Sequence, residues 1–226
     1  MKNGVKFENP YDKSTLVMRP EDSIHIQGRI GADIMMALDD VVKTTSDLSL
    51  VKGACERTIR WIDRNIEAQQ NPETQNLFPI VQGALDPSLR EMCVKELAKR
   101  EMPGYAIGGL AGGESKEDFW KVVHLCTNIL PEDKPRYLMG VGYPVDLVVC
   151  SCLGVDMFDC VFPMRTARFG NAFTKNGFLR VRNSESATEF KPIEDDCDCL
   201  VIELFKFRHA KNILVHTFIC LSIKKK

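Results

Sequence analysis

Residues 77–109 read LFPIVQGALDPSLREMCVKELAKREMPGYAIGG and contain one complete strand, loop, helix and strand unit. A short apolar run at 77–81 is followed by Asp86 and Pro87, an N-cap residue with proline at the first helical position. The pattern predicts a helix over 87–100 and a second strand over 105–107. This order of elements is typical of a parallel α/β sheet or barrel.

The same unit recurs on both sides of this stretch. Further apolar runs lie at 33–38, 136–139 and 155–158, and amphipathic segments at 56–68, 117–130 and 144–153 predict the helices between them. A hairpin over 5–18 and a short helix from Pro20 are expected before them. About five strands are predicted, whereas a closed (β/α)8 barrel needs eight. The pattern leaves two alternatives: an open α/β sheet, or a barrel that lacks its first units.

Composition limits the class of protein. The chain has 226 residues, of which 44% are hydrophobic and 27% charged, and this excludes a disordered chain, a collagen and a disulfide-stapled miniprotein. Most of the nine cysteines lie in apolar runs, as buried reduced thiols of an intracellular protein do. The net charge is −1, so a nucleic-acid contact needs a local patch. Residues 160–183 hold basic residues and no acid; they are either a solvated face or, with their interleaved phenylalanines, an RNA contact.

Polar residues and glycines follow the predicted strands. Functional residues of α/β folds cluster where strands end. The strand ends carry Asp39 and Asp40, Gln82, Gly108 and Gly109, Gly140 and Gly142, and Asp159. For Asp40 a capping or turn role is the favoured interpretation. Asp159 is flanked by apolar residues, so its carboxylate needs a partner or a chemical role.

Several long motifs carry a family resemblance. QGALD (82–86), GYAIGGLAGGES (104–115), KPRYLMGVGYPVDLV (134–148) and VDMFDCVFPMRTARFGNAFT (155–174) closely resemble the tRNA-guanine transglycosylases, and LDDVV (38–42) fits their eukaryotic branch. The resemblance runs from about residue 4 to about residue 199. It implies a partial TIM (β/α)8 barrel over residues 1–183 that lacks its first strands. Residues 184–226 would be a small extension with a degenerate zinc region and a divergent tail.

The resemblance also implies an activity. The family exchanges guanine at wobble position 34 of tRNA for queuine. Asp159 would be the nucleophile, which attacks the ribose C1′ and holds the ribose as a covalent ester. Asp39, Gln82 and the backbone near Gly109 would bind the purine base. Val41 stands where bacterial relatives have cysteine, as expected for queuine as the substrate.

Two segments correspond to tRNA-contacting parts of the family. Arg165 and Arg168 are the expected phosphate or base-edge contacts. The residues of the two segments are Gly140, Val141, Gly142, Tyr143, Pro144, Val145 and Asp146, and Met164, Arg165, Thr166, Ala167 and Arg168.

Partners and a metal are implied in the same way. Cys197 and Cys199 match two ligands of the family's structural zinc, but Ile202 stands at the third position, and a structural zinc site needs four. A homologous accessory subunit would complete a heterodimer. Its location would be the cytoplasm, with peripheral association at the mitochondrial outer membrane.

The sequence departs from the family pattern in ways that keep alternatives open. No DSGGFQ-like segment, which carries the family's second catalytic aspartate, occurs in the chain. A catalytically impaired, truncated form that only binds RNA or a subunit is therefore the second hypothesis. A glycoside hydrolase that uses Asp39 and Asp159 as its acid and base is the third. Met164 replaces a family threonine, and Ala84 replaces a glycine, where its methyl would crowd the base site if φ is positive.

Overall fold

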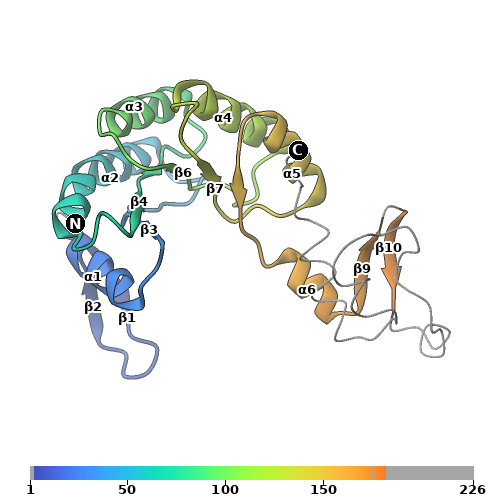
Figure 1. The fold of residues 1–226 in the computed structure, drawn as a ribbon, viewed down its shortest axis with the longest axis horizontal. Coiled ribbons are helices and arrows are strands. Elements are labelled where there is room, and N and C mark those ends of the chain that lie inside the picture. The colour runs from blue at the N-terminus through green and yellow to red at the C-terminus, as the bar shows by residue number, and fades with distance from the viewer. Residues whose placement is uncertain (1–2, 175, 182–226) are drawn as a thin grey trace. The chain divides into compact units, whose positions relative to one another are not determined.

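The computed structural model describes residues 3–174 and 176–181 (Figure 1). The chain divides into two compact units. We call Met1–Val141 with Val145–Asp159 the sheet unit, and Gly142–Pro144 with the chain from Cys160 onward the hairpin unit. Each unit is described by itself.

The sheet unit begins with an antiparallel hairpin and a helix, as the sequence predicts. Strands β1 (Val5–Glu8) and β2 (Thr15–Met18) pair antiparallel, and helix α1 (Pro20–Ile30) follows. Gly31 ends α1 in the left-handed conformation, with φ at 79°. The guanidinium of Arg64 donates to both carboxylate oxygens of Glu21 at 2.6 and 2.8 Å, and so joins α1 to the next helix.

Parallel strands in chain order form two sheets, one of two strands and one of four, and the chain continues from the first to the second through Pro79. Strand β3 (Ile34–Met36) pairs with β4 (Asn76–Phe78), and β5 (Ile80–Val81), β6 (Tyr105–Ile107), β7 (Arg136–Leu138) and β8 (Met157–Phe158) pair in sequence. Only Pro79 separates β4 from β5. This order has no reversal, unlike a doubly wound sheet. The fold is therefore an arc of a barrel with β3 and β8 as its edges, and no strand in the described part of the chain closes it.

The predicted helices link these strands. They are α2 (Leu48–Ala68), α3 (Pro87–Ala98), α4 (Lys116–Ile129) and α5 (Pro144–Cys152). The side chain of Asp86 accepts a hydrogen bond from the Leu89 N–H at 2.8 Å, which confirms the predicted N-cap of α3. Helix α2 begins about two turns before its predicted start, because Val51 and Cys55 continue its buried stripe.

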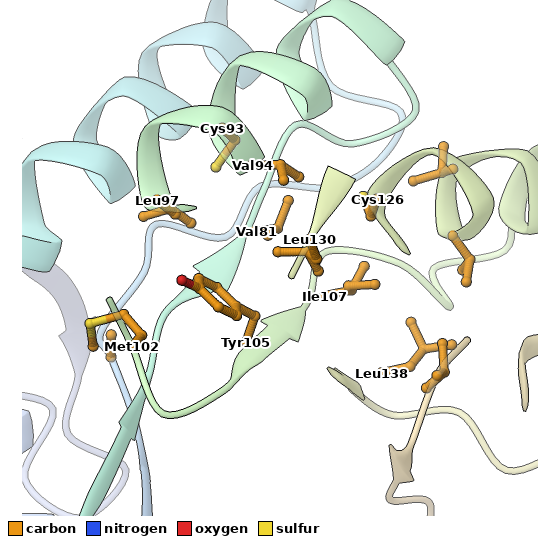
Figure 2. Packing of buried hydrophobic residues seen from close by; sticks show 14 of the residues in the cluster. Val81, Cys93, Val94, Leu97, Met102, Tyr105, Ile107, Cys126, Leu130 and Leu138 are labelled. Carbon is orange, nitrogen blue, oxygen red and sulfur yellow. The ribbon is translucent and has the colours of Figure 1, made fainter. Parts of the chain in front are cut away.

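The core lies between the strands and these helices. Figure 2 shows Val94 and Leu97 of α3 together with Cys126 of α4, packed near Val81 and Ile107 of the strands. All five side chains are fully buried. Burial of the predicted apolar runs thus fixes the strand ends in place, where the polar residues follow.

The hairpin unit contains elements that the sequence pattern did not predict. Helix α6 (Phe162–Arg168) leads into the antiparallel strands β9 (Asn171–Thr174) and β10 (Gly177–Arg180). Ala167 and Ala172 form its small buried cluster, against which Leu179 and Val181 pack. The expected extension at 184–226 lies outside the described residues, and the boundary at 183 stays a prediction.

No helix in the described ranges has both the length and the apolar character that a membrane crossing requires.

Candidate functional site at the carboxyl ends of the strands

The predicted site residues follow parallel strands of the two adjoining sheets. Asp39 comes after β3, Gln82 directly after β5, Gly109 after β6 and Asp159 directly after β8. Because the strands are parallel, their carboxyl ends lie at the same edge of the sheet. Neighbouring strands are about 4.8 Å apart, so the path from Gln82 to Asp159 along the sheet is about 14 Å. All four residues belong to the sheet unit.

Three of these residues are in direct contact. The buried side-chain amide of Gln82 donates to Oδ2 of Asp39 at 2.5 Å. Its Oε1 lies against Gly109, where an added Cβ would approach to 2.2 Å. Gly109 also has φ at +65°. The positive φ therefore favours glycine at 109, and a Cβ there would displace the Gln82 amide.

The Asp39 carboxyl has a perturbed acidity. Burial raises the pKa of Asp39 from 3.8 to about 6, against the opposing effect of the Gln82 hydrogen bond, and the nearby Asp40 charge adds to the rise. Asp40 itself forms an ion pair with Arg57. At neutral pH Asp39 is therefore mainly an ionised hydrogen-bond acceptor, although it takes up a proton about two pH units above an ordinary aspartate.

The Asp159 carboxylate is exposed but held on one side. Its Oδ1 accepts the Tyr137 hydroxyl at 2.5 Å and the Gly140 N–H at 2.8 Å. Gly140 has φ at +74°, which non-glycine residues rarely adopt. Burial, and then the Asp159 hydrogen bond and charge, raise the pKa of Tyr137 well above its usual value, so its hydroxyl remains a donor. The Asp159 carboxylate, which the sequence predicts to need a partner, thus has two hydrogen-bond donors.

Tyr137 was missed in the sequence analysis, although a signal exists. It alternates along β7 with the buried residues Arg136 and Leu138, so the period of two places it on the other face of the strand. Arg90 was missed as well. It shares the helical spacing of the buried residues Cys93, Val94 and Leu97, and its guanidinium is buried beneath the strand ends.

Ala84 has the positive φ at which its methyl was expected to crowd the base site. Its φ is +47°, in the region that favours glycine. Its buried side chain belongs to a small cluster with Val51 and Leu89. The methyl thus has apolar neighbours from α2 and α3, and the backbone, rather than lack of space, is the unfavourable feature.

The structure distributes the predicted tRNA-contacting residues between exposed and buried positions. In the first segment Tyr143 and Val145 are exposed, whereas Val141 and Asp146 are buried. Asp146 pairs with Lys116 at 2.5 Å. In the second segment Met164, Arg165 and Arg168 are exposed and Ala167 is buried. The side chains of Val141, Asp146 and Ala167 are thus buried, and the RNA contacts of both segments stay a prediction.

The hairpin unit contains a row of aromatic rings. Tyr143 and Phe162 have ring centroids 4.1 Å apart, Phe162 and Phe173 are 5.5 Å apart, and Phe173 and Phe178 are 4.6 Å apart. The two end rings are exposed by 52% and 61%, so the row is open to solvent at both ends. We call these four residues the ring row. Phe162 belongs to α6, the helix that also carries the exposed Arg165 and Arg168.

The predicted zinc ligands Cys197 and Cys199 lie outside the described residues. Within 3–174 and 176–181, no group of three or more His, Cys, Asp or Glu side chains could hold a metal ion. With Ile202 at the third ligand position, the matched residues do not make up a four-ligand zinc site.

The sheet and its edge define an α/β protein of the barrel type, with a polar site at the carboxyl ends of its strands. A family model described as queuine tRNA-ribosyltransferase matches residues 1–219. The chain therefore belongs to the queuine tRNA-ribosyltransferase family, and the resemblance to the tRNA-guanine transglycosylases is confirmed.

Curated relatives agree with this assignment. The chain is 54% identical over 197 residues to a queuine tRNA-ribosyltransferase catalytic subunit of Schizosaccharomyces pombe, which covers 87% of the chain and 49% of the relative. It is 51% identical to the catalytic subunit of Caenorhabditis elegans, with the same coverage. It is 45% identical to the Thermus thermophilus enzyme over 89% of the chain and 52% of the relative. The chain spans about half the length of these relatives.

Proposed function

We propose that the chain carries the base-binding and nucleophilic part of a tRNA-guanine transglycosylase, a pentosyltransferase that exchanges guanine at position 34 of tRNA for queuine. The observation that carries the proposal is the contact of Asp39, Gln82 and Gly109 at the same sheet edge as Asp159. Family membership supports it.

The first part of the site suits the edge of a purine. An ionised Asp39 can accept hydrogen bonds from the N1–H and the exocyclic amine of guanine together. Gln82 already points its amide at that carboxylate and so fixes its orientation. The backbone beside Gly109 and the Gln82 amide are within reach of the carbonyl side of the base. A base inside an RNA loop must leave its stack to enter such a site.

The second part of the site suits displacement at the ribose. In the proposed reaction an oxygen of Asp159 attacks C1′, a C1′–O ester bond forms, and the C1′–N9 bond breaks. Guanine leaves with the bonding electron pair and takes up a proton from a general acid. Queuine then attacks C1′ through N9 and gives up its N9 proton to a general base, while the C1′–O ester bond breaks and the Asp159 carboxylate is released. Tyr137 and Gly140 bind Oδ1, so Oδ2 is the oxygen assigned to the attack.

The glycoside hydrolase hypothesis has less support. Its acid and base would need carboxyl groups about 5–9.5 Å apart. Asp39 and Asp159 follow β3 and β8, the first and the last strand of the parallel series, and the Gln82 amide already donates to Asp39. Hydrolysis of simple glycosides in the absence of RNA would revive this hypothesis.

The proposal is tested by guanine exchange. The chain is incubated with an anticodon stem-loop that has guanosine at position 34 and with labelled guanine, beside the variant Asp159→Asn. Label in the RNA that depends on Asp159 supports the proposal. Label incorporated equally by the variant overturns the assignment of the nucleophile.

RNA binding without turnover is the second candidate, and the ring row favours it. Stacking on exposed aromatic rings beside arginines is a common way to hold unpaired bases. All four rings of the row belong to the hairpin unit, and none of them is a residue of the site at the carboxyl ends of the strands. Binding of the stem-loop with no incorporation of guanine would support this second candidate.

The assignments of a partner subunit, a cellular location and a zinc ion rest on the family resemblance. We propose a homologous accessory subunit as partner, since the yeast and nematode relatives are named as catalytic subunits. A cytoplasmic location with peripheral association at the mitochondrial outer membrane belongs to the same proposal. Co-purification of the tagged chain and cell fractionation would test the two points. The zinc at Cys197 and Cys199 stays a prediction.

A further inference from the structure

A buried arginine lies beneath the base-binding residues. Arg90 of α3 has no exposed surface, and its guanidinium donates to three backbone carbonyls. Nε donates to the Ala84 oxygen at 2.8 Å, and one terminal nitrogen donates to the Val81 oxygen at 2.8 Å. The other terminal nitrogen donates to the Gly109 oxygen at 3.4 Å.

The burial of the Arg90 guanidinium is electrostatically unfavourable. Burial lowers the pKa of Arg90, because a buried cation loses its hydration. Arg90 lies at the fourth position of α3, where the dipole of the helix disfavours a positive charge. Among the ion pairs within the described ranges, none includes Arg90. Backbone carbonyl dipoles therefore take the place of a carboxylate partner.

The three carbonyls belong to the segments that form the proposed base site. Val81 immediately precedes Gln82, and Ala84 follows two residues later. The carbonyl of Gly109 belongs to the peptide whose N–H is that of Leu110. This peptide bond is trans, so its N–H points opposite to its C=O. A guanidinium beneath the Gly109 carbonyl therefore turns the Leu110 N–H away from Arg90 and polarises it as a donor.

We propose that Arg90 is a positioning residue of the base site: its guanidinium holds the Gln82 loop and the Gly109–Leu110 peptide in the one orientation that presents their donors to a purine. This inference rests on the proposed base-binding function. Arg90 would act through the Gly109–Leu110 peptide, without touching the base itself.

Arg136 is a matched control in the same chain. It is also a buried arginine that donates to three backbone carbonyls, those of Leu130, Pro131 and Gly154, at 2.8, 3.2 and 3.3 Å. It lies at the first residue of β7, at the amino end of the strands. Substitution at 136 thus removes the same type of interaction from the opposite edge of the sheet.

The test compares Arg90→Lys and Arg90→Met with Arg136→Lys and Arg136→Met. Guanine affinity is measured by calorimetry, and thermal melting reports stability. We expect Arg90→Met to bind guanine about tenfold more weakly or worse, Arg90→Lys to recover part of the loss, and both Arg136 variants to stay within about twofold of the unsubstituted chain at comparable loss of melting temperature. Equal affinity losses at 90 and 136, or none at 90, would overturn the inference.

A second readout does not need the base. Amide hydrogen exchange is measured in the two lysine variants, which keep the charge and so have the better chance to fold. Faster exchange at 82–85 and 109–112 in Arg90→Lys than in Arg136→Lys supports the inference, and equal exchange overturns it. If the unsubstituted chain binds no guanine, the proposed function fails, while this comparison still decides the role of Arg90.

Discussion

Replacement of Asp39 by asparagine should make the protein more stable at neutral pH and should abolish its binding of guanine. The substitution keeps the shape of the side chain and an oxygen that can accept the Gln82 amide hydrogen bond at this position. It removes a carboxylate whose charged form is disfavoured by burial, as the raised pKa of about 6 shows. Function thus requires a charge that the fold would be more stable without.

The expected magnitude follows from the pKa of Asp39. A rise from 3.8 to about 6 corresponds to about 3 kcal/mol at about 1.36 kcal/mol per pH unit, and about 2–3 kcal/mol is expected because the side chain is only half-buried. The folded state holds the Asp39 proton more tightly than the unfolded state. The loss of folding stability caused by ionised Asp39 is therefore absent below about pH 4. It grows as the pH rises and is complete above about pH 6.

Urea unfolding followed by tryptophan fluorescence at pH 4, 6 and 8 measures this difference. Asp39→Asn should equal the unsubstituted chain at pH 4 and exceed it by about 2–3 kcal/mol at pH 8. Asp63→Asn is the control of opposite sign, because its hydrogen bond and ion pair with Arg100 hold the pKa of Asp63 below its usual value, so this variant should be less stable at pH 8. A difference for Asp39→Asn that does not change with pH would refute the reasoning.

Three further results are expected. The guanine affinity of the unsubstituted chain should fall about tenfold between pH 7 and pH 5 in calorimetry, as Asp39 takes up its proton, and a constant affinity would contradict the role of this carboxylate. Ultraviolet titration of the tyrosines should show Tyr137 ionising at lower pH in Asp159→Asn than in the unsubstituted chain, because the neighbouring charge is gone; an unchanged titration would mean that the two groups do not interact in solution. Phe178→Ala should weaken binding of single-stranded RNA by about 1–3 kcal/mol in a filter assay, whereas Phe7→Ala, an exposed ring outside the hairpin unit, should not; equal effects would rule out stacking on the ring row.

The strands and linking helices were predictable because burial leaves a periodic trace. The runs at 77–81 and 105–107 are apolar on both faces, as parallel strands between layers are, and the structure places strands there. Asp86 before Pro87 marked the start of α3 to the residue. The apolar runs alone did not distinguish an open sheet from an arc of a barrel, because this choice depends on strand order, which no single segment encodes; the family resemblance predicted the barrel.

The parts of the site that the sequence did not reveal depend on contacts between distant residues. Tyr137 and Asp159 are 22 positions apart, and their hydrogen bond exists only because β7 and β8 pair in one register. Arg90 could have been suspected from its place on the buried stripe of α3, but not its carbonyl partners at the end of β5 and on the loops after β5 and β6. In the hairpin unit, β9 and β10 are four residues each around a tight turn, too short for a clear alternation.

The central claim is that the base held by Asp39 and Gln82 faces the Asp159 carboxylate. A crystal structure of the chain soaked with guanine tests it most directly. The claim predicts that the Watson–Crick edge contacts Asp39, that the amide of Gln82 is within hydrogen-bond distance of the base, and that N9 is directed toward Asp159. Guanine bound elsewhere, or in this site with N9 directed away from Asp159, would contradict it.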